Sequence, residues 1–163
     1  MVSQADADKM VKAVSALGSI QLPTGGGLSA QELGRFLAIV MDRRERLSEY
    51  HSRVVIKTRV LEARVKNQEA ILKIRFDDYY VNDETVKRKA TGDGRRAMAG
   101  VLCLPQREVL NELRTELAFW TSALEVIEMA QENLKGAKES IRQMIHVIEL
   151  EIDSGGGHRF GGR

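Results

Sequence analysis

Cationic and aromatic side chains gather in the middle of this 163-residue chain. Lys73 and Arg75 are followed by Tyr79 and Tyr80. A further group of bases comes next, at Lys87, Arg88, Lys89, Arg95 and Arg96. Cations that follow a phosphate backbone, beside rings on which bases stack, suit binding of a single nucleic-acid strand without sequence preference. The spacing therefore predicts a single-strand site, because neither a helix-turn-helix nor the paired Cys/His motifs of a double-strand reader are present.

Two further rows of bases precede this group. They are spaced at helical intervals, as Arg46, Arg53, Lys57 and Arg64 in one row and Arg59, Lys66 and Lys73 in the other. Residues 43–75 hold ten bases and four acids. A solvated helix surface usually interleaves Glu with its bases, so this imbalance favours an anionic partner. The predicted nucleic-acid-binding residues therefore include Arg53, Lys57, Arg64 and Lys66, with a solvated coiled-coil face as the alternative interpretation.

Motifs for catalysis are missing from the sequence. There is no H-E-x-x-H, no G-x-S-x-G, and no Lys-Ser/Thr after T-G-G-G to form a phosphate-binding loop. The three histidines are scattered singly, so they form no metal site with Cys103, which we expect to be a small, partly buried apolar residue. We therefore expect no enzyme activity, no metal and no cofactor.

The composition predicts an all-α fold. Aromatic residues make up 5% of the chain, there are two prolines, and 43% of the residues are hydrophobic. A fold of many short strands would need more aromatic, β-branched and turn residues.

The formal net charge of +2 hides a basic first half and an acidic second half, since residues 107–153 hold five bases and ten acids. This division indicates a polyanionic partner for the first half and protein contacts for the second.

Glycine-rich segments predict where the elements begin and end. Residues 1–28 should form a short helix and a Gly-rich linker. The sequence S-A-Q-E at residues 29–32 matches a capping box, and apolar residues then recur every three or four positions, so a long helix should cover residues 29–80. Residues 81–106 should form a basic loop, because two glycines flank Asp93. A second long helix should cover residues 107–153, with a disordered Gly-rich tail over residues 154–163.

The second long helix carries the most regular apolar seam. Its residues alternate by three and four positions, at Leu110, Leu113, Leu117, Trp120, Leu124, Ile127, Leu134, Ile141, Ile145 and Ile148. More than five heptads of this kind predict helical association. The apolar arc is wider than one antiparallel neighbour covers, so we expect helical hairpins to assemble into a homo-oligomeric helical bundle.

One segment resembles a known family. L-K-I-R-F-D-D-Y-Y at residues 72–80 is followed by a polar loop with G-D-G and by E-L-A-F-W-T-S-A-L-E-V-I around Trp120. This order is similar to that of the phage recombination mediator family (UvsY type). The resemblance implies a non-enzymatic protein that binds single-stranded DNA through Lys73 and Arg75. It also implies contacts with a RecA-like recombinase and with the single-stranded-DNA-binding protein. The family assembles through its second amphipathic half, so the resemblance further implies a ring-like homo-oligomer of six or more subunits.

Two other functions stay open. The acidic row Glu125, Glu132 and Glu139 would also suit a structural coiled-coil scaffold or virion protein whose bases pair with acidic helices of neighbouring subunits. A peripheral membrane binder fits less well, because no broad apolar face is left opposite the basic rows. The sequence shows neither a signal peptide nor a membrane span. With a single cysteine, these features predict a cytoplasmic protein, in the host cytoplasm if a phage encodes it.

Overall fold

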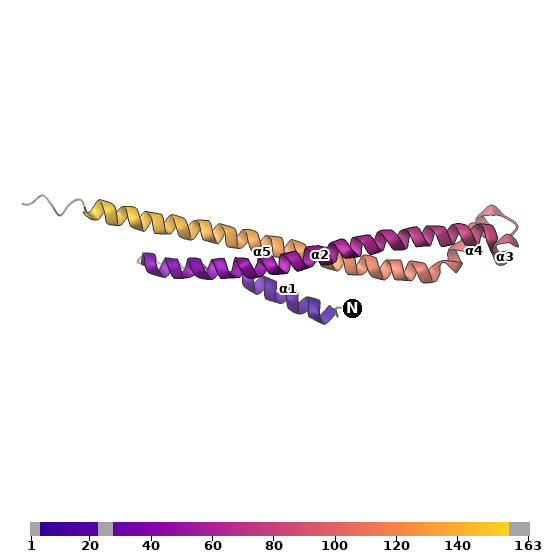
Figure 1. Cartoon of the computed structure of the whole chain (residues 1–163), viewed down its shortest axis with the longest axis horizontal. Helices are drawn as coiled ribbons and strands as arrows, with labels where there is room; N and C mark the ends of the chain where they lie inside the picture. The colour runs from indigo at the N-terminus through magenta and orange to yellow at the C-terminus, as the bar shows by residue number, and fades with distance from the viewer. Residues whose placement is uncertain (1–3, 23–27, 157–163) are drawn as a thin grey trace, which may run out of the picture. The chain divides into compact units, whose positions relative to one another are not determined.

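The computed structural model describes residues 4–22 and 28–156 of the chain. These residues form five helices, which are α1 (Gln4–Gly18), α2 (Ala30–Asn82), α3 (Glu84–Lys87), α4 (Gly92–Leu102) and α5 (Leu104–Gly156) (Figure 1). No strand occurs in these two ranges, so the predicted all-α class is confirmed. Residues 1–3, 23–27 and 157–163, which include most of the predicted tail, lie outside the described part.

A capping box starts α2, as its sequence predicts. The Ser29 hydroxyl accepts a hydrogen bond from the Glu32 backbone N–H at 3.2 Å, and Glu32 Oε2 accepts one from the Ser29 backbone N–H at 2.8 Å. These reciprocal bonds satisfy N–H groups that have no partner within the helix. The backbone and side-chain hydrogen bonds from Ser29 also lower the pKa of Glu32.

The segment over residues 81–106 is largely helical rather than a loop. Asp83 caps α3 by accepting hydrogen bonds from the backbone N–H groups of Thr85 and Val86. Thr91 caps α4, because its hydroxyl accepts a hydrogen bond from the Gly94 backbone N–H at 3.1 Å. The glycines around Asp93 therefore lie in the first turn of α4, where a good cap offsets their low helix propensity. α3 and α4 contact each other.

Two compact units share the long helices. Unit 1 comprises Met1–Arg53 and Ala123–Arg163, and unit 2 comprises Val54–Ser122. The core of unit 1 brings together α1, α2 and α5, through buried side chains of Val14, Leu33, Val40, Leu47, Ile127, Leu134 and Ile141. A Cβ built on Gly18 would lie 2.5 Å from the Ala130 Cβ, so only glycine permits this approach of α1 to α5. Ala130 belongs to a buried stripe of small residues with Ala123 and Ala137.

Unit 2 pairs the second part of α2 with the first part of α5. Its buried apolar side chains are Val54, Leu61, Val65, Val86, Ala99, Cys103, Leu110 and Trp120. Lys57 contacts Glu116, whereas Gln68, farther along α2, donates a hydrogen bond to the carbonyl of Gln106, which lies earlier on α5. The two segments therefore run antiparallel within this unit.

The apolar seam of α5 packs largely inside the chain. Leu110, Trp120, Ile127, Leu134 and Ile141 are buried. The other five residues of the seam are all partly exposed, at Leu113, Leu117, Leu124, Ile145 and Ile148. The buried half of this seam is not available to a second copy, so an interface between copies needs apolar surface from elsewhere on the chain. Assembly through the seam stays a prediction.

Candidate nucleic-acid interface

A groove between α2 and α5 in unit 2 combines cations with an aromatic ring. It has a volume of about 490 Å³ and is lined by Glu69, Leu72, Lys73, Phe76, Arg107, Leu110, Asn111 and Arg114. The first four come from α2 and the last four from α5. Residues i, i+4 and i+7 share one face of a helix, which explains why these side chains converge.

The charge of the groove is positive. Lys73, Arg107 and Arg114 supply three cations, and Glu69 supplies one carboxylate. Arg114 Nη2 lies 2.6 Å from Glu69 Oε1, so this pair fixes the arginine on one wall of the groove. An excess of two positive charges remains, and charge-assisted hydrogen bonds from Lys and Arg are well suited to phosphate.

Aromatic faces lie beside these cations. Phe76 lines the groove, and its ring stacks with that of Tyr80 at a centroid distance of 6.4 Å and an interplanar angle of 10°. Both side chains are partly exposed. Tyr79 is also partly exposed but does not line the groove. Cations beside an accessible ring can hold both the phosphates and the bases of a single strand.

The structure separates the two cations of the L-K-I-R segment. Lys73 lines the groove, whereas Arg75 does not and is exposed elsewhere on α2. Residues two positions apart project from different sides of a helix, so this separation follows from α2 itself. The groove therefore combines Lys73 with Phe76 rather than with Arg75.

The predicted basic loop forms an ordered cationic surface in unit 2. Lys87 lies 3.9 Å from Glu84 within one turn, and Arg95 Nε donates a hydrogen bond to the Lys89 carbonyl at 3.2 Å. All five bases of this segment are exposed, at Lys87, Arg88, Lys89, Arg95 and Arg96. None of the five lines the groove.

Lys57, in the first of the two basic rows, pairs with a carboxylate on another helix. Its Nζ lies 2.9 Å from Glu116 and 5.9 Å from the Trp120 ring centroid. Its positive charge is therefore already balanced within unit 2. Arg53, Arg64 and Lys66 are exposed, as the interpretation of an anion-binding surface requires.

Sequence analysis missed Arg107 and Arg114. Both lie in the acidic half of the chain, so the regional charge balance hid them. Their spacing around Asn111, at i, i+4 and i+7, places all three on one helix face and was the available signal. The pairing of this face with Lys73 had no signal in the sequence.

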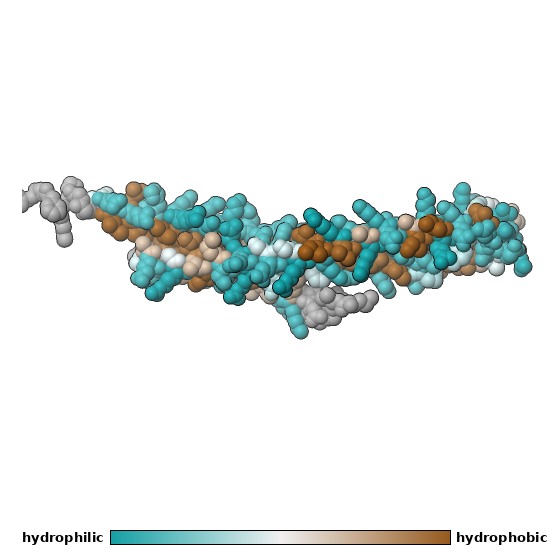
Figure 2. Space-filling view, viewed as in Figure 1, coloured by the Kyte–Doolittle hydropathy of each residue, from teal (hydrophilic) through white to brown (hydrophobic). Residues whose placement is uncertain are grey.

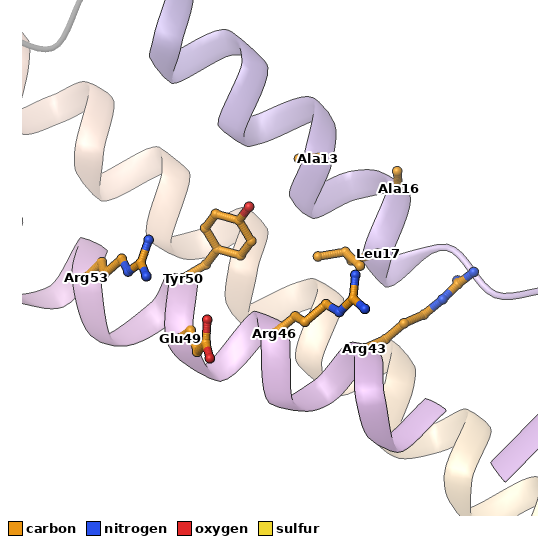
Figure 3. Close-up of a pocket in the computed structure, with 8 residues that line it drawn as sticks. All are labelled: Ala13, Ala16, Leu17, Arg43, Arg46, Glu49, Tyr50 and Arg53. Atoms are coloured by element: carbon orange, nitrogen blue, oxygen red, sulfur yellow. The ribbon is translucent and has the colours of Figure 1, made fainter. Parts of the chain in front are cut away.

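A second basic groove occurs in unit 1, between α1 and α2. It is lined by Ala13, Ala16, Leu17, Arg43, Arg46, Glu49, Tyr50 and Arg53 (Figure 3). Arg43 Nη1 donates a hydrogen bond to the Ser19 carbonyl at 2.8 Å, and Arg46 Nε lies 3.1 Å from Asp42. Two of its three arginines thus contact other protein groups, which makes the unit 2 groove the stronger candidate.

Other chemistry has little basis in the described residues. Within them, no group of three or more His, Cys, Asp and Glu side chains could hold a metal ion. Cys103 is buried, and this burial raises the pKa of its thiol. The described helices include none that is long and apolar enough to cross a membrane. Comparison with protein-family models, curated proteins and solved structures found no match.

Proposed function

We propose that this protein binds single-stranded DNA and acts as a recombination mediator without enzymatic activity. The observation that carries the proposal is the unit 2 groove, where Lys73, Arg107 and Arg114 lie beside Phe76. The resemblance of residues 72–80 and the Trp120 region to the UvsY type supports the biological role. In that role, the protein would help to load a RecA-like recombinase onto DNA coated by single-stranded-DNA-binding protein.

The groove would hold the strand by two kinds of contact. Lys73 and Arg107 would bind phosphates, and the ring of Phe76 would stack with a base. The exposed bases at residues 87–96 would add further phosphate contacts. Each copy would bind weakly, but several copies in one ring would act together through a high effective concentration. This combined binding free energy would loosen the coating protein and present the strand to the recombinase.

Oligo-dT binding as a function of salt tests the strand-binding step. In single-strand binding, each phosphate that the protein neutralises adds about 0.7 to the steepness of log affinity against log salt. We therefore expect K73A/R107A to weaken binding at least tenfold and to make this dependence shallower by about 1.4 per copy if each side chain contacts one phosphate. The control R35A/R142A removes the same charge from unit 1 and should leave the salt dependence unchanged.

Two results would overturn this assignment. One is absence of oligo-dT binding at low salt, and the other is equal weakening of binding in K73A/R107A and its control. Recombinase assembly on coated single-stranded DNA tests the mediator role. The unchanged protein should accelerate assembly, and K73A/R107A should not.

A structural scaffold is the second candidate. It is favoured by bases that already contact acidic side chains of α5, as Lys57 does with Glu116. A scaffold whose bases are used in protein contacts should give no gel shift with single-stranded DNA. A shift that K73A/R107A abolishes would reject this alternative.

A further inference from the structure

The outer face of α2 in unit 2 carries a second apolar stripe. It follows alternating steps of four and three residues, at Ile56, Val60, Ala63, Asn67, Ala70 and Ile74. At 3.6 residues per turn, these positions lie on the side of α2 opposite the buried Val54, Leu61 and Val65. Ile56, Val60 and Ile74 are 64%, 44% and 67% exposed. Figure 2 shows hydrophobic surface over this part of α2, bordered by hydrophilic side chains.

This spacing is that of a helix-pairing seam. Alternating steps of four and three keep apolar side chains facing one partner helix. Ala63 and Ala70 would let a partner backbone approach closely, and Asn67 is the kind of polar seam residue that fixes register. The stripe therefore fits a helix better than it fits nucleic acid, which offers no continuous apolar face for aliphatic side chains.

Bases border the stripe on both sides. Arg59 and Lys66 lie along one edge, and Arg64 and Arg75 lie along the other. All four are exposed. Two such faces would repel each other if they met. The partner helix must therefore carry acidic residues beside its own apolar contacts.

An acidic helix face of this kind exists within the chain itself. On the part of α5 in unit 1, Glu125, Glu132 and Glu139 are spaced by seven residues, and all three are exposed. Arg59 and Lys66 have the same spacing, which is about 10.5 Å along a helix. Met129 is 61% exposed beside this row, and a Cβ at Gly136 would meet no atom within 4 Å. Glu132 also contacts Lys135 at 3.2 Å, so this row is partly screened.

We propose that the outer α2 stripe of one copy binds the acidic α5 face of a second copy. This contact deepens the proposed function, because it explains the assembly on which combined strand binding depends. It joins two different faces, so each copy can bind one neighbour with each face. Such a heterologous contact closes into a ring or continues as a filament.

Charge reversal at the two faces tests this contact. We expect R59E/K66E and E125K/E132K each to shift the native mass from the assembled particle toward the 18.2 kDa subunit. The variant that combines all four reversals should recover the assembled mass, because the attraction is restored with opposite signs. I56S/I74S should also dissociate the particle, and circular dichroism should show unchanged helix content in every variant.

The contact is overturned if R59E/K66E and E125K/E132K both keep the assembled mass, or if the unchanged protein is a single subunit in dilute buffer. Anionic vesicles provide a separate check. If they bind the unchanged protein through the stripe while I56S/I74S keeps its mass, the stripe faces lipid and the proposal is rejected. The strand-binding variant K73A/R107A should keep the assembled mass. Failure of the interface and failure of strand binding are therefore measured separately.

Discussion

Replacing Lys57 with methionine should weaken unit 2 and leave strand binding nearly unchanged. Lys57 and Glu116 are only 30% and 29% exposed in their side chains, and their charged atoms are 2.9 Å apart. The same ammonium lies 5.9 Å from the Trp120 ring centroid. Methionine retains most of the apolar stem, so this change removes the two electrostatic contacts with little loss of packing.

The expected destabilisation follows from these two contacts. A salt bridge near the surface contributes about 0.2–1 kcal/mol. A cation close to an aromatic ring contributes about 0.5–1 kcal/mol at such a site. The sum is about 0.7–2 kcal/mol, which should lower the urea midpoint by about 0.35–1 M if the denaturant slope is about 2 kcal/mol per molar.

Trp120 fluorescence provides the assay, because it is the only tryptophan in the chain. Unfolding should be measured at one subunit concentration, since assembly makes apparent stability depend on concentration. Arg142→Met is the matched control at an exposed arginine of α5 and should change stability by less than about 0.5 kcal/mol. A double-mutant cycle with Glu116→Gln should give a coupling of about 0.5–1 kcal/mol. An unchanged midpoint in Lys57→Met with tenfold weaker oligo-dT binding would refute the structural role.

Further substitutions test the packing and the helix cap. Gly18→Ala should speed hydrogen exchange in α1, because the added Cβ would lie 2.5 Å from the Ala130 Cβ on α5. Gly136→Ala should stabilise α5 by up to about 1 kcal/mol, because a Cβ at this position would meet no atom within 4 Å. Leu134→Ala should lower the free energy of unfolding in urea by about 2–5 kcal/mol, and a decrease below about 1 kcal/mol would contradict its full burial. Ser29→Ala should raise the pKa of Glu32 partway toward its ordinary value in an NMR titration. Because this pKa is lowered in the folded chain, the cap stabilises α2 above the ordinary Glu pKa, and its contribution disappears as the pH falls through the lowered value.

Helix periodicity predicted which residues face the cores. Leu33, Val40 and Leu47 are buried at the spacing that the sequence shows, and the capping box at Ser29 starts α2. These features depend on interactions within one helix or on one apolar face, so a single sequence contains them. The helical segment at residues 92–102 was missed, because the glycines were given more weight than the cap that Thr91 supplies.

The sequence did not predict which face of α2 packs against which face of α5. The periodicity places Lys73 on one face of α2 and Arg107 on one face of α5, but no property of either helix says that these faces meet. The same limit applies to Lys57. Its place in a basic row predicted a role in nucleic-acid binding, whereas the structure shows that it contacts Glu116. Register between two long helices depends on packing along their whole contact and is not encoded at one position.

The number of cations on α2 therefore does not determine what each cation does. Lys57, Lys66 and Lys73 carry the same charge, but the first contacts Glu116, the second borders the outer stripe, and the third lines the groove. Removing one charge at each position should thus change three different quantities, which are the unfolding midpoint, the native mass and the affinity for oligo-dT. Equal decreases of affinity in all three variants would mean that a diffuse positive field attracts the strand. In that case, the groove would contribute to the affinity for oligo-dT only in proportion to its share of the positive charge.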